Sequence, residues 1–133
     1  MKWSAQLCVL LALAVVAGVG ACTEYPTRPV DRRPAISSVV VFPNVLGQGD
    51  SALVTVIASD PDGDALVYDW ETDSRLIIKG NRPGDGQLYN TFSNSHVFYR
   101  STSPAVDTAW VYCSVRDQKG GGDGQLVLIP LRD

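Results

Sequence analysis

Three aspartates at alternate positions, Asp60, Asp62 and Asp64, could bind a metal ion. Clustered carboxylates are the ligands that a hard cation such as Ca²⁺ prefers, and Glu71 stands eleven residues after Asp60, as in an EF-hand loop. The glycine, however, is at position 63, and Pro61 stiffens the segment, which also suits a tight turn capped by aspartate side chains. We expect an Asp-capped turn over residues 60–64, with a calcium site as the alternative.

His96 is the only histidine, with the hydroxyls of Ser93 and Ser95 close by and Asp107 further along the chain. A catalytic triad also needs a nucleophile on a sharp turn and an oxyanion hole, and no pattern for either is present. A zinc site usually needs three protein ligands. We therefore expect no enzyme, and we keep a small cell-envelope hydrolase as a remote alternative.

Two aromatic residues, Trp110 and Tyr112, alternate with small apolar residues along positions 107–116. Side chains of a strand alternate between its two faces, so Ala109, Val111, Cys113 and Val115 are expected in the core and both rings on the outside. Val67, on a neighbouring strand, is expected to join them. An apolar patch on a solvent face is typical of protein interfaces or carbohydrate platforms. The alternative is that the connection 80–94 folds over this face.

The elements that position these residues are strands. From Ile36 onward, β-branched residues and turn clusters recur every eight to twelve residues, with no helical spacing of apolar positions. The predicted strands are 36–42, 51–59, 65–71, 75–79, 95–100, 107–116 and 125–131. Seven short strands on about one hundred residues predict an all-β sandwich. The last strand is apolar on both faces, so alternation does not choose its inward side.

Two sequence patterns in this region resemble those of a known family. Residues Ala58–Trp70 read A-x-D-P-D-G-D-x-L-x-Y-x-W, and Val115–Gly121 read V-x-D-x-x-G-G. Together they resemble bacterial immunoglobulin-like modules of the PKD and cadherin-like type. The resemblance implies an immunoglobulin-like, seven-stranded antiparallel β-sandwich over residues 36–131. In such a sandwich Cys113 is expected to pack beside Trp70, with an intermolecular disulfide as the alternative.

The N-terminus has the features of a targeting segment. Lys2 precedes an apolar run over residues 7–19, and Val19-Gly20-Ala21-Cys22 resembles the lipobox of bacterial lipoproteins. The resemblance implies a signal peptide over 1–21 and a diacylglycerol on Cys22. Thr23, where Asp would favour the inner membrane, favours the outer membrane of a bacterial cell envelope. Residues 22–34, with three prolines, predict an extended tether, and 35–133 the folded domain.

The charge balance excludes one class of partner. The chain has 11 Lys and Arg against 14 Asp and Glu, and removing residues 1–21 removes one Lys and no acid, which leaves 10 − 14 = −4. Phosphate binding needs clustered Lys and Arg, so nucleic acid is not an expected partner. The sequence predicts a non-catalytic surface lipoprotein, anchored to the membrane by lipid, without a cofactor unless calcium binds at 60–64, that presents its domain to a protein or carbohydrate ligand.

Overall fold

The computed structural model describes residues 27–82, 84–102 and 107–133. The predicted signal peptide and Cys22 lie outside these residues. Residues Asp31–Asp133 form one compact unit, whereas the described residues 27–30 belong to a separate unit and are exposed, without regular structure. In the described part of the chain no helix is long and apolar enough to cross a membrane.

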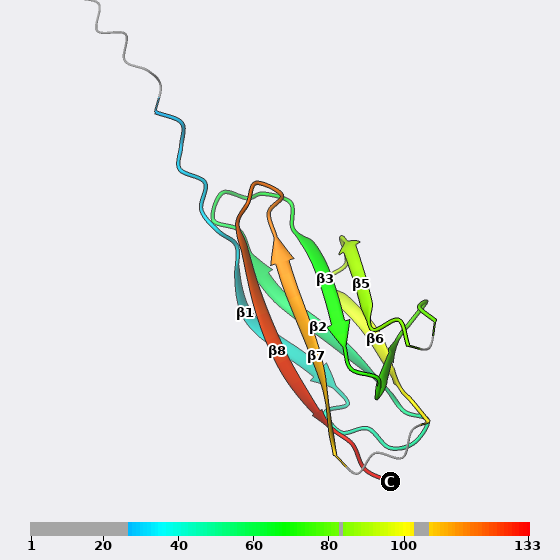
Figure 1. Cartoon of the computed structure of the whole chain (residues 1–133). Coiled ribbons are helices and arrows are strands. Elements are labelled where there is room, and N and C mark those ends of the chain that lie inside the picture. The colour runs from blue at the N-terminus through cyan, green and yellow to red at the C-terminus, as the bar shows by residue number, and fades with distance from the viewer. Residues whose placement is uncertain (1–26, 83, 103–106) are drawn as a thin grey trace, which may run out of the picture. The chain divides into compact units, whose positions relative to one another are not determined.

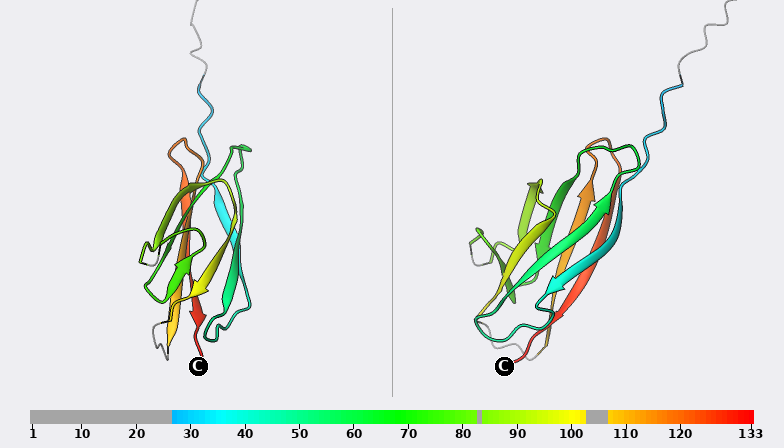
Figure 2. Two further views of the ribbon diagram at one scale, coloured as in Figure 1. Left: turned by 90° about the vertical axis from the view of Figure 1, so that its right-hand side faces the viewer. Right: turned by 180° about the vertical axis from the view of Figure 1, so that it is seen from behind.

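Two antiparallel sheets of four strands pack face to face, which confirms the predicted immunoglobulin-like β-sandwich (Figures 1 and 2). The first sheet has the order β1-β2-β6-β4, with β1 (Ala35–Phe42), β2 (Ser51–Ser59), β6 (Ser95–Arg100) and β4 (Leu76–Ile78). The second has the order β5-β3-β7-β8, with β5 (Gln87–Thr91), β3 (Val67–Thr72), β7 (Thr108–Arg116) and β8 (Gly122–Pro130).

The predicted number of seven strands is wrong, because the described residues form eight. The additional strand is β5, which lies within the segment 80–94 that was predicted to be a connection. It pairs with β3 through an irregular register and forms the edge of the second sheet. A five-residue edge strand with one exposed side carries too short an alternation to be recognised.

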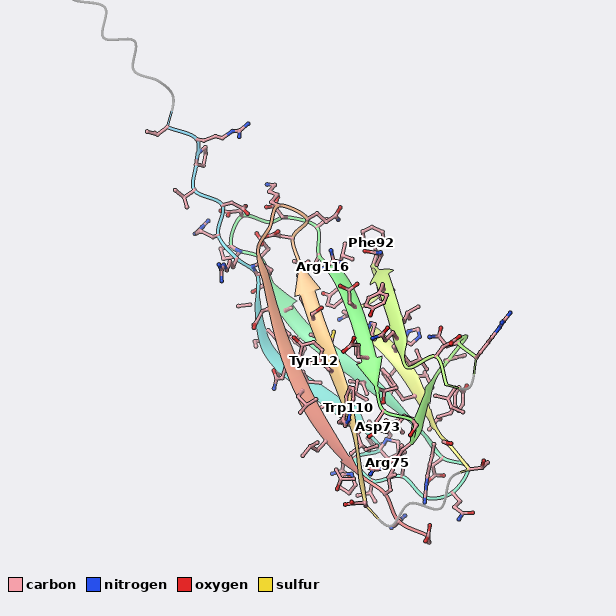
Figure 3. The ribbon with its side chains drawn as sticks, viewed as in Figure 1. Asp73, Arg75, Phe92, Trp110, Tyr112 and Arg116 are labelled. Atoms are coloured by element: carbon pink, nitrogen blue, oxygen red, sulfur yellow. The ribbon has the colours of Figure 1, made fainter. Side chains whose placement is uncertain are left out.

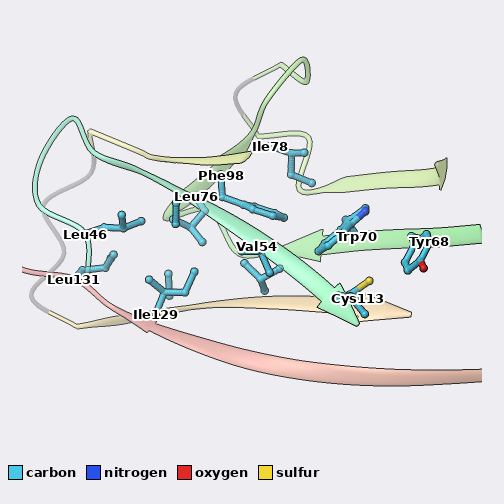
Figure 4. Close-up of a cluster of buried hydrophobic side chains, with 14 of the residues drawn as sticks. Leu46, Val54, Tyr68, Trp70, Leu76, Ile78, Phe98, Cys113, Ile129 and Leu131 are labelled. Carbon is cyan, nitrogen blue, oxygen red and sulfur yellow. The ribbon is translucent and has the colours of Figure 1, made fainter. Parts of the chain in front are cut away.

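The core lies between the sheets, and its composition confirms the predicted strand faces (Figure 4). Trp70 and Cys113 are paired across β3 and β7 and both are buried, as expected from the alternation. Burial raises the pKa of the Cys113 thiol to about 12, so it remains protonated and behaves as a small apolar side chain. For the last strand, where the alternation did not choose a side, Ile129 lies on the inward side and is buried.

Candidate functional site

The outward face of the second sheet carries the two predicted aromatic residues on β7 (Figure 3). Trp110 pairs with Leu128 and Tyr112 pairs with Leu126, so the four side chains share one side of the sheet. Both rings are half-buried, while Leu126 and Leu128 are 54% and 61% exposed. We call these four residues the aromatic face.

Trp110 is held at the end of β3 by its backbone. Its carbonyl accepts a hydrogen bond of 2.7 Å from Thr72 Oγ1, and its N–H donates to Asp73 Oδ2 over 3.3 Å. Asp73 Oδ1 in turn accepts the N–H of Arg75 at 2.8 Å, as in an Asx turn. The indole therefore projects from a strand segment whose backbone is fixed by Thr72, the last residue of β3, and by Asp73, which follows it.

Tyr112 lies across Gly124 of β8. A Cβ at position 124 would come within 2.1 Å of the Tyr112 Oη and 2.7 Å of its Cζ, so only glycine leaves room for this ring. The phenol thus covers the bare backbone of β8 with one side. Its other side faces outward beside Leu126, its partner in the register.

Val67, the third residue predicted for this face, lies on the outward side of β3 but is only 4% exposed. It shares a shallow depression with Asn90, Phe92 and Arg116. The prediction that Val67 contributes to an exposed patch is therefore wrong. Alternation gives the direction of a side chain but not the cover supplied by long neighbours such as arginine.

A polar network around Asp69 separates Val67 from the aromatic face. Asp69 accepts hydrogen bonds from Arg116 Nε at 2.8 Å and from the Asn90 N–H at 2.8 Å. Burial acts to raise the pKa of Asp69, but the bonds from Arg116 and Asn90 outweigh it and hold this pKa below its ordinary value. The carboxylate is therefore ionised and immobilised at neutral pH.

Beside Trp110 the face opens into a depression of about 600 Å³. Its other wall is formed by Asn81, Asp85 and Gln87, so the segment 80–94 lies beside Trp110 instead of folding over the aromatic face. The Asn81 amide donates to the carbonyls of Asp85 and Gln87, at 3.2 and 2.7 Å, and so fixes this wall. Hydrogen bonds within the chain therefore hold this wall of the depression.

The chemistry of this depression is that of hydrogen-bond acceptors and amides next to an aromatic ring. Glu71 Oε1 accepts from Gln87 Nε2 at 2.7 Å and from Tyr89 Oη at 3.4 Å. Partial desolvation and the Glu71 carboxylate raise the pKa of Tyr89, so the phenol remains a donor. The described residues that line the depression include no Lys or Arg. A ligand here would be neutral or positively charged and would carry hydroxyl or amino groups.

The aspartate corner at 60–64 is a capped turn, as expected. Asp60 Oδ1 accepts the N–H groups of Asp62 and Asp64 at 2.7 and 3.3 Å. Glu71 does not take part in an EF-hand arrangement, because it lies within β3 and bonds to residues of β5. The Asp60 side chain therefore caps the turn.

The corner also gathers charges from distant parts of the chain. Arg32 donates to Asp62 through Nε at 2.9 Å and through its backbone N–H at 2.7 Å, and Lys119 Nζ donates to Asp64 at 2.7 Å. The backbone N–H of Arg32, and after it the Arg32 side chain, lower the pKa of Asp62, and the bond to Asp64 raises the pKa of Lys119. We call residues Asp31, Asp62 and Asp64, with these two cations, the charged corner.

Carboxylate oxygens of Asp31, Asp62 and Asp64 lie within 4.8 Å of one another. Desolvation and the neighbouring Asp117 raise the pKa of Asp31. Among the described residues, three buried oxygens, Oδ2 of Asp60, Asp64 and Asp117, have no hydrogen-bond partner. Buried carboxylate oxygens are rarely left unpartnered, and hard oxygen donors of this kind suit a calcium ion.

His96 does not assemble a hydrolytic site in the described structure. The centroid of its ring lies 6.2 Å from the ring centroids of both Trp70 and Phe98, and its Nε2 lies 3.1 Å from the carbonyl oxygen of Lys79. Ser93 and Ser95 instead bond to each other and to their neighbours. This arrangement is that of a histidine packed at the edge of the core.

The parts of these sites that come from remote segments were not predicted from the sequence. Asp31 and Arg32 were assigned to the tether, and they reach Asp62 across about thirty residues of sequence. Gln87 and Tyr89 were within the supposed connection. The only available signal was the alternation of Leu88 between two polar neighbours, which is weak evidence for a strand.

No model of a known protein family matches this chain, and no curated protein sequence matches it. Among solved structures, the chain is similar to a nucleoside hydrolase-related hypothetical protein from Saccharophagus degradans that is associated with carbohydrate metabolism. The likeness has a TM-score of 0.56 at 18% sequence identity and covers 77% of this chain but 26% of the other, so this chain spans about a quarter of that protein. At this identity the similarity supports the fold alone.

Proposed function

We propose that this chain is a non-catalytic, lipid-anchored module of a bacterial cell envelope, on its outer membrane, that binds a protein or glycan through its aromatic face. The anchor would be the diacylglycerol on Cys22. The carrying observation is the half-exposed pair Trp110 and Tyr112 beside the exposed Leu126 and Leu128. Apolar surface of this kind stays in contact with water only at a thermodynamic cost, which a partner would remove.

The depression beside Trp110 narrows the class of ligand. Acceptors and amides next to an aromatic ring are suited to the hydroxyl groups and the C–H faces of a neutral sugar, or to a polar loop of a protein. Glu71 and Asp85 in its wall disfavour acidic ligands. The association of the similar Saccharophagus degradans protein with carbohydrate metabolism is consistent with the glycan alternative.

The test is to bind the full chain and its Trp110→Ala variant to an array of neutral and acidic glycans and to solubilised envelope proteins. We expect binding of neutral ligands that the variant loses, with a change in the free energy of unfolding of about 1 kcal/mol or less. Loss of about 3 kcal/mol or more would mean that the indole is part of the core. Mass spectrometry of the membrane fraction, which should find an acylated Cys22, tests the anchor separately.

The charged corner supports a second candidate function, calcium-dependent adhesion. Asp31, Asp62 and Asp64 would hold the ion, and the buried, partnerless Oδ2 of Asp64 is the observation that favours it. A bound Ca²⁺ supplies positive charge and carboxylate coordination. On the chain's side, Asp31 would tie the segment before β1 to the turn between β2 and β3.

Thermal unfolding with and without excess calcium tests this candidate. A cation that binds only the folded chain stabilises it by about 2.7 kcal/mol at a hundredfold excess over its Kd, so the midpoint should rise. Asp62→Asn should abolish that rise, and magnesium in place of calcium should give a smaller one because it keeps its waters. An unchanged midpoint of the native chain in calcium would remove the candidate.

A further inference from the structure

The outward face of the first sheet is apolar, and the outward positions within its four strands carry no charge. Five of its large side chains are exposed: Val40, Phe42, Leu53, Ile57 and Tyr99. The register places Phe42, Leu53 and Val97 in one row across β1, β2 and β6, with Leu53 in the middle. The remaining outward positions of these strands are filled by Ala35, Ile77 and serine and threonine side chains. We call this surface the uncharged face.

The lack of charge limits what can bind there. A membrane surface or a nucleic acid is attracted by clustered Lys and Arg, and the outward positions of the four strands have neither. The exposed Lys79 directly follows the edge strand β4 and donates its backbone N–H to the Val97 carbonyl at 2.9 Å, so a single lysine stands at this edge of the face. The ion pairs between described residues all lie elsewhere, and Arg100 of β6 points inward and is buried. A partner must therefore present an apolar, uncharged surface of similar flatness.

A second copy of the chain meets that requirement. The chain carries a net charge of −3, so two copies repel through most surfaces, but the strand residues of two uncharged faces oppose no like charges. A two-fold axis would bring the same patch of both copies together, as in most homodimers. Two sheets packed in this way lie about 10 Å apart with their strands about 30° from parallel, which is the geometry already present inside the sandwich.

The size of the uncharged face sets the expected strength of the dimer. Four strands spaced about 4.8 Å apart and about seven residues long cover roughly 450 Å². This is about half of the 800 Å² that each partner contributes to a standard interface. Two such faces would bury roughly 900 Å² together, less than the about 1,000 Å² expected of a stable interface, so we expect a weak, transient dimer. Tethering to one membrane would raise the local concentration and favour it.

We infer that the uncharged face is a self-association surface through which two copies of this chain form a weak, symmetric dimer centred on Leu53. This surface is on the opposite side of the sandwich from the aromatic face. The dimer therefore leaves the proposed ligand site free, and the two proposals can fail independently.

The experiment compares two lysine substitutions with the full chain. Leu53→Lys places a charge at the centre of the uncharged face in both copies, whereas Leu128→Lys makes the same change on the aromatic face. Sedimentation equilibrium in a mild detergent, up to about 1 mM protein, measures association. Energy transfer between two labelled pools in lipid vesicles repeats the measurement without detergent on the apolar surface.

We expect a monomer–dimer equilibrium for the native chain, at least about a tenfold lower association constant for Leu53→Lys, and no change for Leu128→Lys. Should circular dichroism show that Leu53→Lys is unfolded, Ile57→Lys on the same face replaces it. A native chain that stays monomeric in both measurements overturns the inference. Equal weakening by Leu128→Lys, or energy transfer no greater than random mixing in the membrane, does so as well.

Discussion

The outward faces of the two sheets are built by the same alternation of side chains, yet they differ in charge. On the second sheet, Trp110 and Tyr112 lie on the same side as Asp69, Glu71 and Arg116. The first sheet has only apolar and hydroxyl side chains at its outward positions. The comparison shows that alternation decides which side chains reach water, whereas the charges among them decide what can bind. A face with carboxylates and a depression suits a polar ligand, and a flat face without charge suits its own copy.

The largest expected effect is a difference in stability between variants on the inward and outward sides of the second sheet. Trp70→Ala removes a fully buried indole and should lower the free energy of unfolding by about 3–5 kcal/mol, whereas Trp110→Ala should cost about 1 kcal/mol or less. Urea unfolding of both variants gives the values. Similar losses of stability for the two variants would show that Trp110 is buried. The aromatic face would then not be exposed, and it could not be compared with the uncharged face as a second binding surface.

The next effect concerns the charges that distinguish the second sheet. Asp69→Asn removes the ion pair with Arg116 and should cost about 1–2 kcal/mol at neutral pH, an estimate reduced for the exposure of Arg116. The folded-state pKa of Asp69 lies below the ordinary 3.8, so this stabilisation is present above that value and is lost as the pH falls through the folded pKa.

Thermal midpoints of the native chain and Asp69→Asn between pH 7 and pH 2 test this sign. The difference between them should be constant at neutral pH and should shrink in acid, while the other carboxyl groups titrate in both proteins. A difference that instead grows in acid would mean that folding favours the protonated form of Asp69 over the ionised form.

A smaller effect is expected from Gly124→Ala. The new methyl group would collide with the Tyr112 phenol, which must swing away at a cost of about 1 kcal/mol. Ligand binding to the aromatic face should weaken, whereas dimerisation through the uncharged face should not change. Chemical-shift mapping of the Tyr112 ring would show the displacement, and an unmoved ring would contradict the arrangement described here.

The smallest effect is on the stability of the two lysine variants. Leu53 and Leu128 are 45% and 61% exposed, so replacing either with Lys should change the free energy of unfolding of the monomer by no more than about 0.5 kcal/mol. Thermal melts at low protein concentration provide the check. A large loss for Leu53→Lys alone would indicate that this side chain packs within one copy.

Most of the fold could be predicted because strand alternation and turn residues are local signals. The strand 51–59 agrees with β2 at both ends, and 95–100 agrees with β6. Cys113 and Trp70 were expected to pack together, and they do, because each belongs to an alternating run with an unambiguous apolar side. β5 was missed because five residues at a sheet edge carry too little pattern.

The sites were less predictable because they depend on side-chain cover and on distant contacts. Val67 points outward as expected, but Arg116 and Phe92 lie beside it in the same depression. Leu53 and Ile57 were not singled out, although the strand 51–59 is apolar on both sides, and that was the available signal. The bond from Arg32 to Asp62 joins residues thirty positions apart, which no local pattern contains.

The placement of the chain's ends within the sandwich has a mechanical consequence. The chain enters at the end where Arg32 holds Asp62, and the C-terminus lies at the opposite end (Figure 1). A pull between these ends would slide β1 along β2 and β8 along β7, because both pairs are antiparallel ladders that run the length of the molecule. The hydrogen bonds of each ladder would then be loaded together in shear instead of opening one after another, so this domain is arranged to resist tension along its long axis.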